Sequence, residues 1–325
     1  MCARGGTAFL APMPAPPSSP HPETAAVALS VEAARARLAE LAFARDSHLC
    51  RAARNWPEGR RDLFLAAYMA MRSIDDHVDG LPPQARGPAS PALETIETWR
   101  RAVSGAAEGH ITGTADATLQ AALVLLAVRM PASPLDLRPF EALAGAMRHD
   151  AAGAPMADFD AWLAYAEGAS VAPTYVFLLL LACDPSARRL AADIDPQGLW
   201  QAAQTFGRYC YMAHIVRDLA ADAGGGPHLL TVPETWYRRH CRDRRELASH
   251  LLDPTGATSC AVRAAFVAQM DALRPAVDEA VRRFERAAGR EAAAMVEAVL
   301  GAYRRLHHEA RAETRGNVDP ASAVR

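Results

Sequence analysis

The stretch Arg72-Ser73-Ile74-Asp75-Asp76-His77-Val78-Asp79 ends a run of otherwise apolar, helical sequence. A second stretch, Arg217-Asp218-Leu219-Ala220-Ala221-Asp222, follows about 140 residues later in a similar setting. Each places two aspartates at i and i+4, on one helix face, where like charges repel and burial is costly. Two such pairs on apolar helices predict a positive group between them. The economical candidate is Mg²⁺, which prefers oxygen ligands and binds through a few carboxylates plus substrate phosphates.

The segments around these stretches predict two long helices. Residues 60–78 form one, stopped by a Gly-Leu-Pro-Pro sequence, and residues 199–221 form the other, ended by Gly224-Gly225-Gly226-Pro227. Asp75 and Asp79 therefore fall in the last helical turn, where the helix dipole disfavours anions. That placement costs stability, which indicates that these aspartates serve another purpose.

Composition favours a helical protein, and the length allows one large domain or two small ones. The 325 residues are 50% hydrophobic and 6% aromatic, rich in Ala, Leu and Arg, and show no sustained period-two alternation. The net charge of -2 gives no field for nucleic acid, and the basic residues are all Arg, which excludes a Schiff-base or P-loop lysine. We predict an all-α fold, a single helical bundle with a central cavity.

The remaining pattern predicts further helices and two tails. Residues 1–27 are Pro/Ala-rich and are expected to be disordered, 28–312 form the helical domain, and 313–325 form a loose tail. The other helices are expected at residues 31–43, 49–56, 91–107, 115–130, 136–151, 158–183, 233–252, 258–287 (broken near Pro275) and 290–312.

Cysteine and hydropathy patterns indicate a cytoplasmic protein. The six cysteines are scattered without a CxxC pair or zinc spacing, as in a reduced compartment. We find no apolar run of the roughly 18 residues that span a bilayer. The longest, Tyr175 to Cys183, is interpreted as a buried helix.

Several polar residues beside the aspartates have two interpretations. Arg72 and Arg217 present planar forks suited to phosphate oxygens, but ordinary helix-surface ion pairs are an alternative. His214, four residues before Asp218, is suited to a phosphate, a metal or a plain hydrogen bond with that carboxylate. The pair His149-Asp150 is a weaker signal, because a metal phosphohydrolase would need further histidines at recognisable spacing.

The stretch from Tyr165 to Thr174 interrupts a helical run with small residues and Pro173. Its functional interpretation is a cavity wall that admits a long apolar ligand. Close helix–helix packing explains the same residues equally well.

At these residues the chain resembles the squalene/phytoene synthase family, the head-to-head trans-prenyl synthases. Residues 72–79 look like the family's first aspartate-rich motif, and residues 217–222 look like its second. Val232-Pro233-Glu234 is similar to the family's segment after the second motif. The resemblance spans roughly residues 40–310.

The resemblance implies an all-α isoprenoid-synthase domain that joins two prenyl diphosphates with the help of Mg²⁺. By resemblance, two or three Mg²⁺ ions would be held by four aspartates: Asp75, Asp79, Asp218 and Asp222. Diphosphate would be contacted by Arg72 and Arg217.

The chain departs from the family pattern at several positions. His214 stands where the family has Asn, and Tyr211 where it has Gln. The N-terminal Ser-Lys-Ser/Thr-Phe motif is replaced by Arg45-Asp46-Ser47-His48-Leu49. Arg45, His48 and His214 remain suited to binding diphosphate, whereas Asp46 would repel it.

Three functions are therefore compared. The favoured one is Mg²⁺-dependent head-to-head condensation of farnesyl (C15) or geranylgeranyl (C20) diphosphate. The alternatives are a terpene synthase that cyclises one diphosphate and a non-catalytic family member that binds lipid or assists assembly. The donor length, the product, a reduction step with NADPH and the oligomeric state are left open. Because such products are insoluble lipids, peripheral membrane contact is expected.

Overall fold

The computed structural model describes residues 29–45, 47–191 and 194–316, excluding the side chains of 315 and 316. Within these ranges every regular element is a helix, so the predicted all-α class is confirmed. The expectations for residues 1–27 and for Asp46 lie outside the described residues. The helices are α1 (Val31–Ala44), α2 (His48–Ala53), α3 (Glu58–Asp79), α4 (Ala92–Ala107), α5 (Ala117–Arg129), α6 (Arg138–Ala151), α7 (Phe159–Ala166), α8 (Ala172–Leu181), α9 (Pro196–Gly225), α10 (Glu234–Tyr237), α11 (Arg244–Leu251), α12 (Ala257–Ala288) and α13 (Arg290–Gly316).

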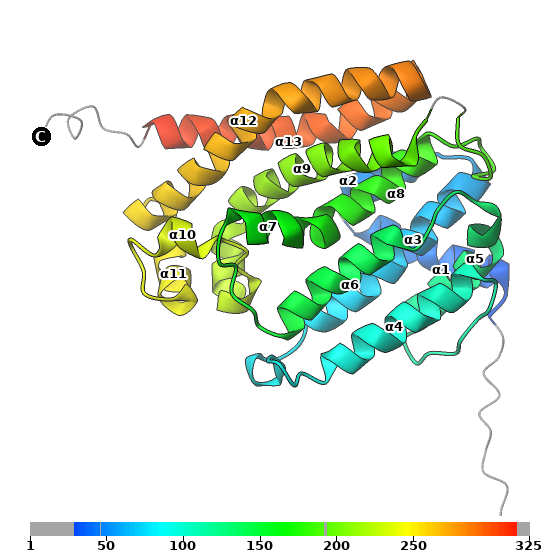
Figure 1. The fold of residues 1–325 in the computed structure, drawn as a ribbon, viewed down its shortest axis with the longest axis horizontal. Helices are drawn as coiled ribbons and strands as arrows, with labels where there is room; N and C mark the ends of the chain where they lie inside the picture. The colour runs from blue at the N-terminus through cyan, green and yellow to red at the C-terminus, as the bar shows by residue number, and fades with distance from the viewer. Residues whose placement is uncertain (1–28, 46, 192–193, 317–325) are drawn as a thin grey trace, which may run out of the picture.

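The helices form a bundle in which α8 lies between the two motif-bearing helices. Figure 1 shows α9, α12 and α13 along one side of the molecule and α1, α4 and α5 along the other, with α3, α6 and α8 between them. Helix α3 packs against α5, α6 and α8, while α9 packs against α8, α12 and α13. The first motif ends α3 and the second lies near the end of α9, so α8 contacts both helices that carry the aspartates.

Local sequence explains where α3 and α9 begin and end. The Asp195 side chain accepts hydrogen bonds from the backbone N–H groups of Gln197 (3.1 Å) and Gly198 (2.8 Å), which caps the start of α9. Gly226, at φ +135°, ends α9, and its N–H donates to the Asp222 carbonyl at 3.0 Å. The Gly80 N–H likewise bonds the Asp76 carbonyl at 3.1 Å. Both predicted helices are confirmed, with ends that extend a few residues further.

The predicted helix over residues 158–183 is interrupted by one wide turn. Between α7 and α8 the segment Glu167–Val171 is π-helical. Close approaches hold it on two sides: a Cβ on Gly168 would lie 2.3 Å from the Ala142 carbonyl oxygen on α6, and one on Gly207 of α9 would lie 2.9 Å from Val171 Cα. The π segment is thus clamped between two helices at positions where only glycine fits.

Three further boundary predictions are wrong. The single helix expected at 233–252 is two, α10 and α11, because the Asp243 side chain accepts from the N–H groups of Arg245 and Glu246 and starts a new helix. Helix α12 continues through Pro275 instead of breaking there. Helix α13 reaches Gly316, so the loose tail does not begin at residue 313. The amphipathic pattern of α13 continues beyond residue 312, and Arg263 of α12 pairs with Glu313 at 2.7 Å.

In the part of the chain that the structure describes, one helical stretch is long and apolar enough to cross a membrane by length and composition, contrary to expectation. It runs over Phe159–Leu181, 23 residues with a mean hydropathy of 1.3, and includes the π segment. The expectation counted only unbroken apolar runs, whereas this stretch contains scattered polar residues. Of its most apolar window, 61% is buried inside the protein, as in the core helix of a packed bundle.

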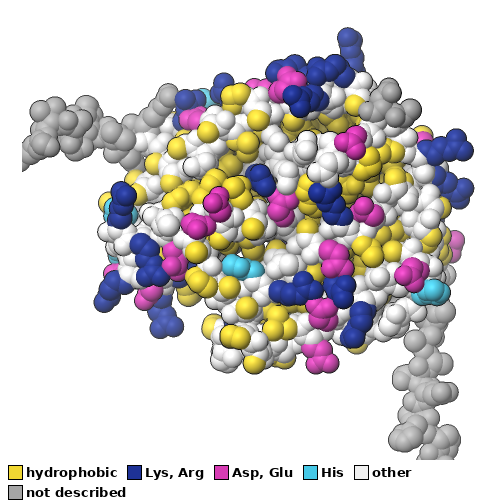
Figure 2. All heavy atoms as spheres, in the orientation of Figure 1, with side chains coloured by type: hydrophobic (Ala, Val, Ile, Leu, Met, Phe, Trp, Pro, Cys, Tyr) yellow, Lys and Arg dark blue, Asp and Glu magenta, His cyan; other side chains and the backbone are white. Residues whose placement is uncertain are grey.

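Surface charge is mixed in sign. Figure 2 shows acidic and basic side chains interspersed over the visible face rather than gathered into a basic patch. This distribution agrees with the net charge of -2.

Candidate active site

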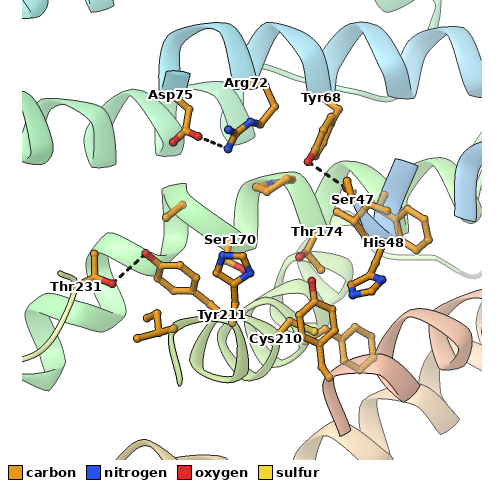
Figure 3. Close-up of a pocket in the computed structure, with 18 of the residues that line it drawn as sticks. Ser47, His48, Tyr68, Arg72, Asp75, Ser170, Thr174, Cys210, Tyr211 and Thr231 are labelled. Carbon is orange, nitrogen blue, oxygen red and sulfur yellow. Dashed lines mark hydrogen bonds and ion pairs between the residues drawn. The ribbon is translucent and has the colours of Figure 1, made fainter. Parts of the chain in front are cut away.

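One cavity of about 450 Å³ opens between α3, α8, α9 and α13. Its polar end is lined by the first aspartate motif and by the end of α9, and its other end is apolar. Ser47 and His48, where α2 starts, lie beside Tyr68 and Tyr303. Figure 3 shows Asp75, Arg72 and Tyr68 projecting from α3 toward Ser170, Tyr211 and Thr174 across this space. The cavity therefore joins the two motifs that the sequence places far apart.

The first motif is a half-exposed cluster of like charges held by arginine. Arg72 pairs with Asp75 and, at 2.5 Å, with Asp76, which also pairs with Arg45. Burial raises the pKa of Asp75 to about 6. The positive charge of Arg72 lowers this pKa, and the negative charges of Asp79 and Asp76 raise it. Burial also raises the pKa of Asp79, against Arg72 and Arg86. The arginine charges therefore only partly offset the cost of burying these carboxylates beside one another.

Arg86 explains how α3 tolerates aspartates at its C-terminal end. Its guanidinium donates to the carbonyls of Val78 (2.8 Å), Asp79 (3.1 Å) and Leu81 (3.4 Å), and to that of Asp150 at 3.1 Å. A cation at these carbonyls offsets the negative end of the helix dipole. Because Asp150 lies at the end of α6, the same side chain ties the ends of α3 and α6 together.

The second motif is divided between a paired and an unpaired carboxylate. Asp218 accepts from Arg217 at 2.7 and 2.5 Å and lies 3.1 Å from His214. Burial acts against it, but these partners hold the pKa of Asp218 below its usual value. Burial, with the charges of Asp218 and Asp79, raises the pKa of Asp222 to about 6. Asp222 and Asp79 thus affect one another across the cavity.

The structure brings nearly all the predicted site residues to this cavity. Eight of them line it: Arg45, His48, Arg72, Asp75, Asp79, His214, Arg217 and Asp222. Asp218 is not part of the lining, although both of its partners are. Burial lowers the pKa of His214, against the opposing charge of Asp218, which favours a neutral ring that bonds its neighbours.

The comparison with protein families decides the assignment. A sequence model of squalene/phytoene synthase matches residues 42–320, most of the chain. The chain belongs to the squalene/phytoene synthase family. The resemblance seen in the two aspartate motifs is thereby confirmed. The family consists of prenyltransferase-type enzymes of isoprenoid biosynthesis that act on prenyl diphosphates.

Solved structures of squalene/phytoene synthase type have the same fold. Squalene synthase HpnC from Alicyclobacillus acidocaldarius matches with a TM-score of 0.65 and 17% identity, over 88% of this chain and 94% of that one. A dehydrosqualene synthase in complex with a ligand matches with a TM-score of 0.57 and 14% identity, over 88% and 98%. A comparison with curated proteins finds no match.

In this family member, the donor set at the polar end fits a hard divalent cation that substrate phosphates help to bind. Asp75, Asp79 and Asp222 supply carboxylate oxygens whose pKa values are raised, mainly by desolvation and further by neighbouring carboxylates. Among the described residues, no three His, Cys, Asp or Glu side chains are already grouped closely enough to hold one ion. Mg²⁺ suits such an open arrangement, because it commonly takes one or two carboxylates and completes its shell with phosphate and water.

A second polar group, only weakly marked in the sequence, lies in the same cavity. The Tyr165 hydroxyl donates to the Asp150 carboxylate at 2.8 Å, and both residues line the cavity with Tyr211. Burial raises the pKa of Asp150 to about 7, with smaller contributions from Asp79 and Asp75, against the Tyr165 hydrogen bond. The signal was the His149-Asp150 dipeptide, but its histidine packs against the Tyr165 ring and does not line the cavity.

Changing Tyr165 to Phe is expected to raise the pKa of Asp150, because the lost hydrogen bond stabilised the carboxylate. The measurement is a pH titration of the labelled Asp carboxyl carbons by NMR, with Asp150→Asn identifying the signal. Tyr175→Phe serves as the control, since its buried ring lies outside the cavity. An unchanged or lowered pKa for Asp150 in Tyr165→Phe would refute the assigned hydrogen bond.

Both interpretations of the stretch 165–174 hold for this family member. Ala169, Ser170, Pro173 and Thr174 line the cavity, as a wall for an apolar ligand requires. Close packing is equally real, since Ser170 Oγ donates to the Gly207 carbonyl of α9 at 2.8 Å. Small residues here make room inside the cavity while they allow two helices to approach outside it.

Proposed function

We propose that this protein catalyses the Mg²⁺-dependent head-to-head condensation of two prenyl diphosphates, with release of diphosphate. The observation that carries the proposal is one cavity with two chemically distinct ends. Carboxylates from α3 and α9, with raised pKa values, lie at one end, and apolar side chains line the other. A prenyl diphosphate has the same division into a charged head and an apolar chain.

The residues at the polar end are suited to binding the head group. Asp75, Asp79, Asp218 and Asp222 would hold the metal, which when bound neutralises charge on the departing diphosphate. The cations would bind the diphosphate oxygens: Arg45, Arg72 and Arg217, with His48 and His214 beside them. In the structure these arginines pair with aspartates, so substrate binding would redistribute existing ion pairs rather than add cations to a neutral site.

The apolar end is suited to an allylic cation. Phe177, Leu178 and Leu300 keep water from the chain, and the rings of Tyr68 and Tyr303 line the same cavity. Excluding water prevents premature capture of the cation, and aromatic faces stabilise positive charge.

The test is incubation of the purified protein with Mg²⁺ and farnesyl or geranylgeranyl diphosphate, with and without NADPH. Diphosphate release and extracted lipids are read by mass, beside a chelated sample and an Asp75→Ala/Asp218→Ala variant. A C30 or C40 product that both controls lose supports the proposal. Diphosphate release with only C15 or C20 products would favour the cyclase alternative. No turnover of either donor by folded protein would favour the non-catalytic one.

A further inference from the structure

A carboxylate in the π turn, that of Glu167, accepts hydrogen bonds from three side chains of α9. The donors are Trp200 Nε1 at 3.1 Å, Gln204 Nε2 at 3.0 Å and Arg208 Nη2 at 2.5 Å. They follow one another at spacings of four residues, so they lie along one face of α9. We call these four residues the Glu167 anchor. The Glu167 side chain is 23% exposed, so its ion pair with Arg208 is partly shielded from water.

The Trp200 ring extends the anchor to two more helices. The Tyr175 ring of α8 lies 5.0 Å from the Trp200 ring, and the Arg138 guanidinium of α6 lies 4.0 Å from it. One carboxylate thus connects the π turn with α9 and, through Trp200, with α6 and α8. No member of the anchor lines the cavity. Any effect of the anchor on the reaction must therefore act through the position of other residues.

The wide turn depends on such external contacts. The Ala172 N–H bonds the Glu167 carbonyl, five residues back, instead of the carbonyl four residues back that an α-helix uses. This geometry is rare and is found mostly as single turns inside α-helices, frequently at functional sites. The close approach at Gly168 makes room for the turn, whereas the hydrogen bonds of Glu167 attach it to α9.

The anchor lies in sequence between two residues of the cavity wall. Tyr165, two residues before Glu167, donates to the Asp150 carboxylate at 2.8 Å. Ser170, three residues after Glu167, donates to the Gly207 carbonyl at 2.8 Å. Both Tyr165 and Ser170 line the cavity, and Figure 3 shows Ser170 there. A displacement of Glu167 along α9 would therefore move both ends of this wall.

We infer that Glu167 is a positioning residue, whose bonds to α9 hold Tyr165 against Asp150. The same bonds keep Ser170 in the cavity wall. The role in turnover rests on the proposed function, whereas the effect on Tyr165 and Asp150 does not. A misplacement of about 1 Å near a reacting centre can cost about 10²-fold in rate, so a group outside the cavity can control the reaction strongly.

The test compares Glu167→Ala with Glu167→Gln. Alanine removes every side-chain bond of the anchor. Glutamine keeps the length and one acceptor oxygen, and its amide can donate to Gln204 once the Gln204 amide turns over. The first measurement is the pKa of Asp150, by NMR titration of labelled Asp carboxyl carbons. Glu167→Ala is expected to raise this pKa, because Tyr165 no longer stabilises the carboxylate, and Glu167→Gln to leave it near the wild-type value.

The second measurement is steady-state turnover of a prenyl diphosphate with Mg²⁺. Glu167→Ala is expected to lower kcat about tenfold or more and to change KM by less than about twofold, because the groups that would bind diphosphate are not part of the anchor. Glu167→Gln should recover most of this loss. Trp200→Phe removes one donor and keeps a ring, so it should move both measurements in the same direction by less. It decides the result if Glu167→Ala does not fold.

Asp271→Ala is the matched control. Asp271 of α12 pairs with His307 and Arg311 of α13, each at 3.3 Å, so it too is a carboxylate shared between helices, and it does not line the cavity. Its loss should lower stability and leave both measurements unchanged. Folded Glu167→Ala and Trp200→Phe proteins that lose only stability would overturn the inference. If wild type turned over no prenyl diphosphate, the proposed function would fail, and the titration of Asp150 would still decide the role of Glu167.

Discussion

Replacing Asp75 or Asp222 with asparagine is expected to reduce turnover about 10³-fold and, at the same time, to stabilise the metal-free protein. Activity falls because the carboxylate charge that holds the metal is lost. Stability rises because each carboxylate is ionised at neutral pH at a cost, which its raised pKa of about 6 records. A residue kept for stability would show the opposite result.

The pH dependence of this stabilisation follows from linkage. Asp75 has a usual pKa of 3.8 and a pKa of about 6 in the folded protein, so the folded state binds more protons between these values. Stability conferred by this residue therefore falls as the pH rises from about 4 to about 6, and the penalty persists above that range. The Asp75 side chain is 22% exposed. With allowance for screening, Asp75→Asn should gain about 1–2 kcal/mol at pH 7.5 and nothing below pH 4.

The measurements are urea unfolding from pH 4 to 8 without metal, and steady-state turnover with Mg²⁺. Glu94→Gln is the matched control, because it removes one acidic charge from an exposed position on α4. It should change neither activity nor the slope of stability with pH. An Asp75→Asn protein that is less stable than wild type at pH 7.5 would contradict the assigned burial cost.

Gly168→Ala is expected to destabilise the protein by about 3 kcal/mol and to lower its activity. The added methyl would lie 2.3 Å from the Ala142 carbonyl oxygen and 2.7 Å from Ala146 Cβ, so the π segment and α6 must move apart. That movement stretches the Tyr165–Asp150 hydrogen bond, which joins the same two parts of the fold at 2.8 Å. The change is read from the urea midpoint at constant slope and from turnover.

Gly145→Ala provides the comparison on α6, the helix that faces Gly168. A Cβ at Gly145 meets nothing within 4 Å, so alanine there should be neutral or stabilise α6 by about 0.5–1 kcal/mol through helix propensity. If Gly168→Ala were as harmless as Gly145→Ala, the close approach of α6 to the π segment would be disproved.

Much of the site was predictable because charge and periodicity are local properties. Asp75 and Asp79 repeat at helical spacing within an apolar run, and so do Asp218 and Asp222, so the amino-acid sequence alone indicates that they share a purpose. The ends of α3 and α9 were likewise marked by glycine and proline. The all-α class followed from composition, since few residues favour strands.

What the sequence did not reveal depends on contacts between distant segments. The pairing of Tyr165 with Asp150 arises where α6 meets α7, and Arg86 reaches carbonyls on two helices. Neither of these two sets of contacts is marked by a sequence motif. The rings of Trp56, Phe64 and Phe177 likewise pack together from separate segments, and each alone is an ordinary core residue. Helix α12 runs through Pro275 because its packing outweighs a local penalty that the sequence alone overstates.

The π turn at Glu167–Val171 acts as a phase shift within the long apolar helix. In a regular helix, residues advance by about 100° each, so Tyr165 and Phe177 would point about 120° apart. One residue absorbed by the wide turn reduces that angle to about 20°, and both side chains then face the same cavity. Deleting a single residue here would leave hydropathy and helix content almost unchanged while rotating a different face of α8 toward the substrate. The identity of that wall is therefore encoded in a count of residues, not in their chemistry.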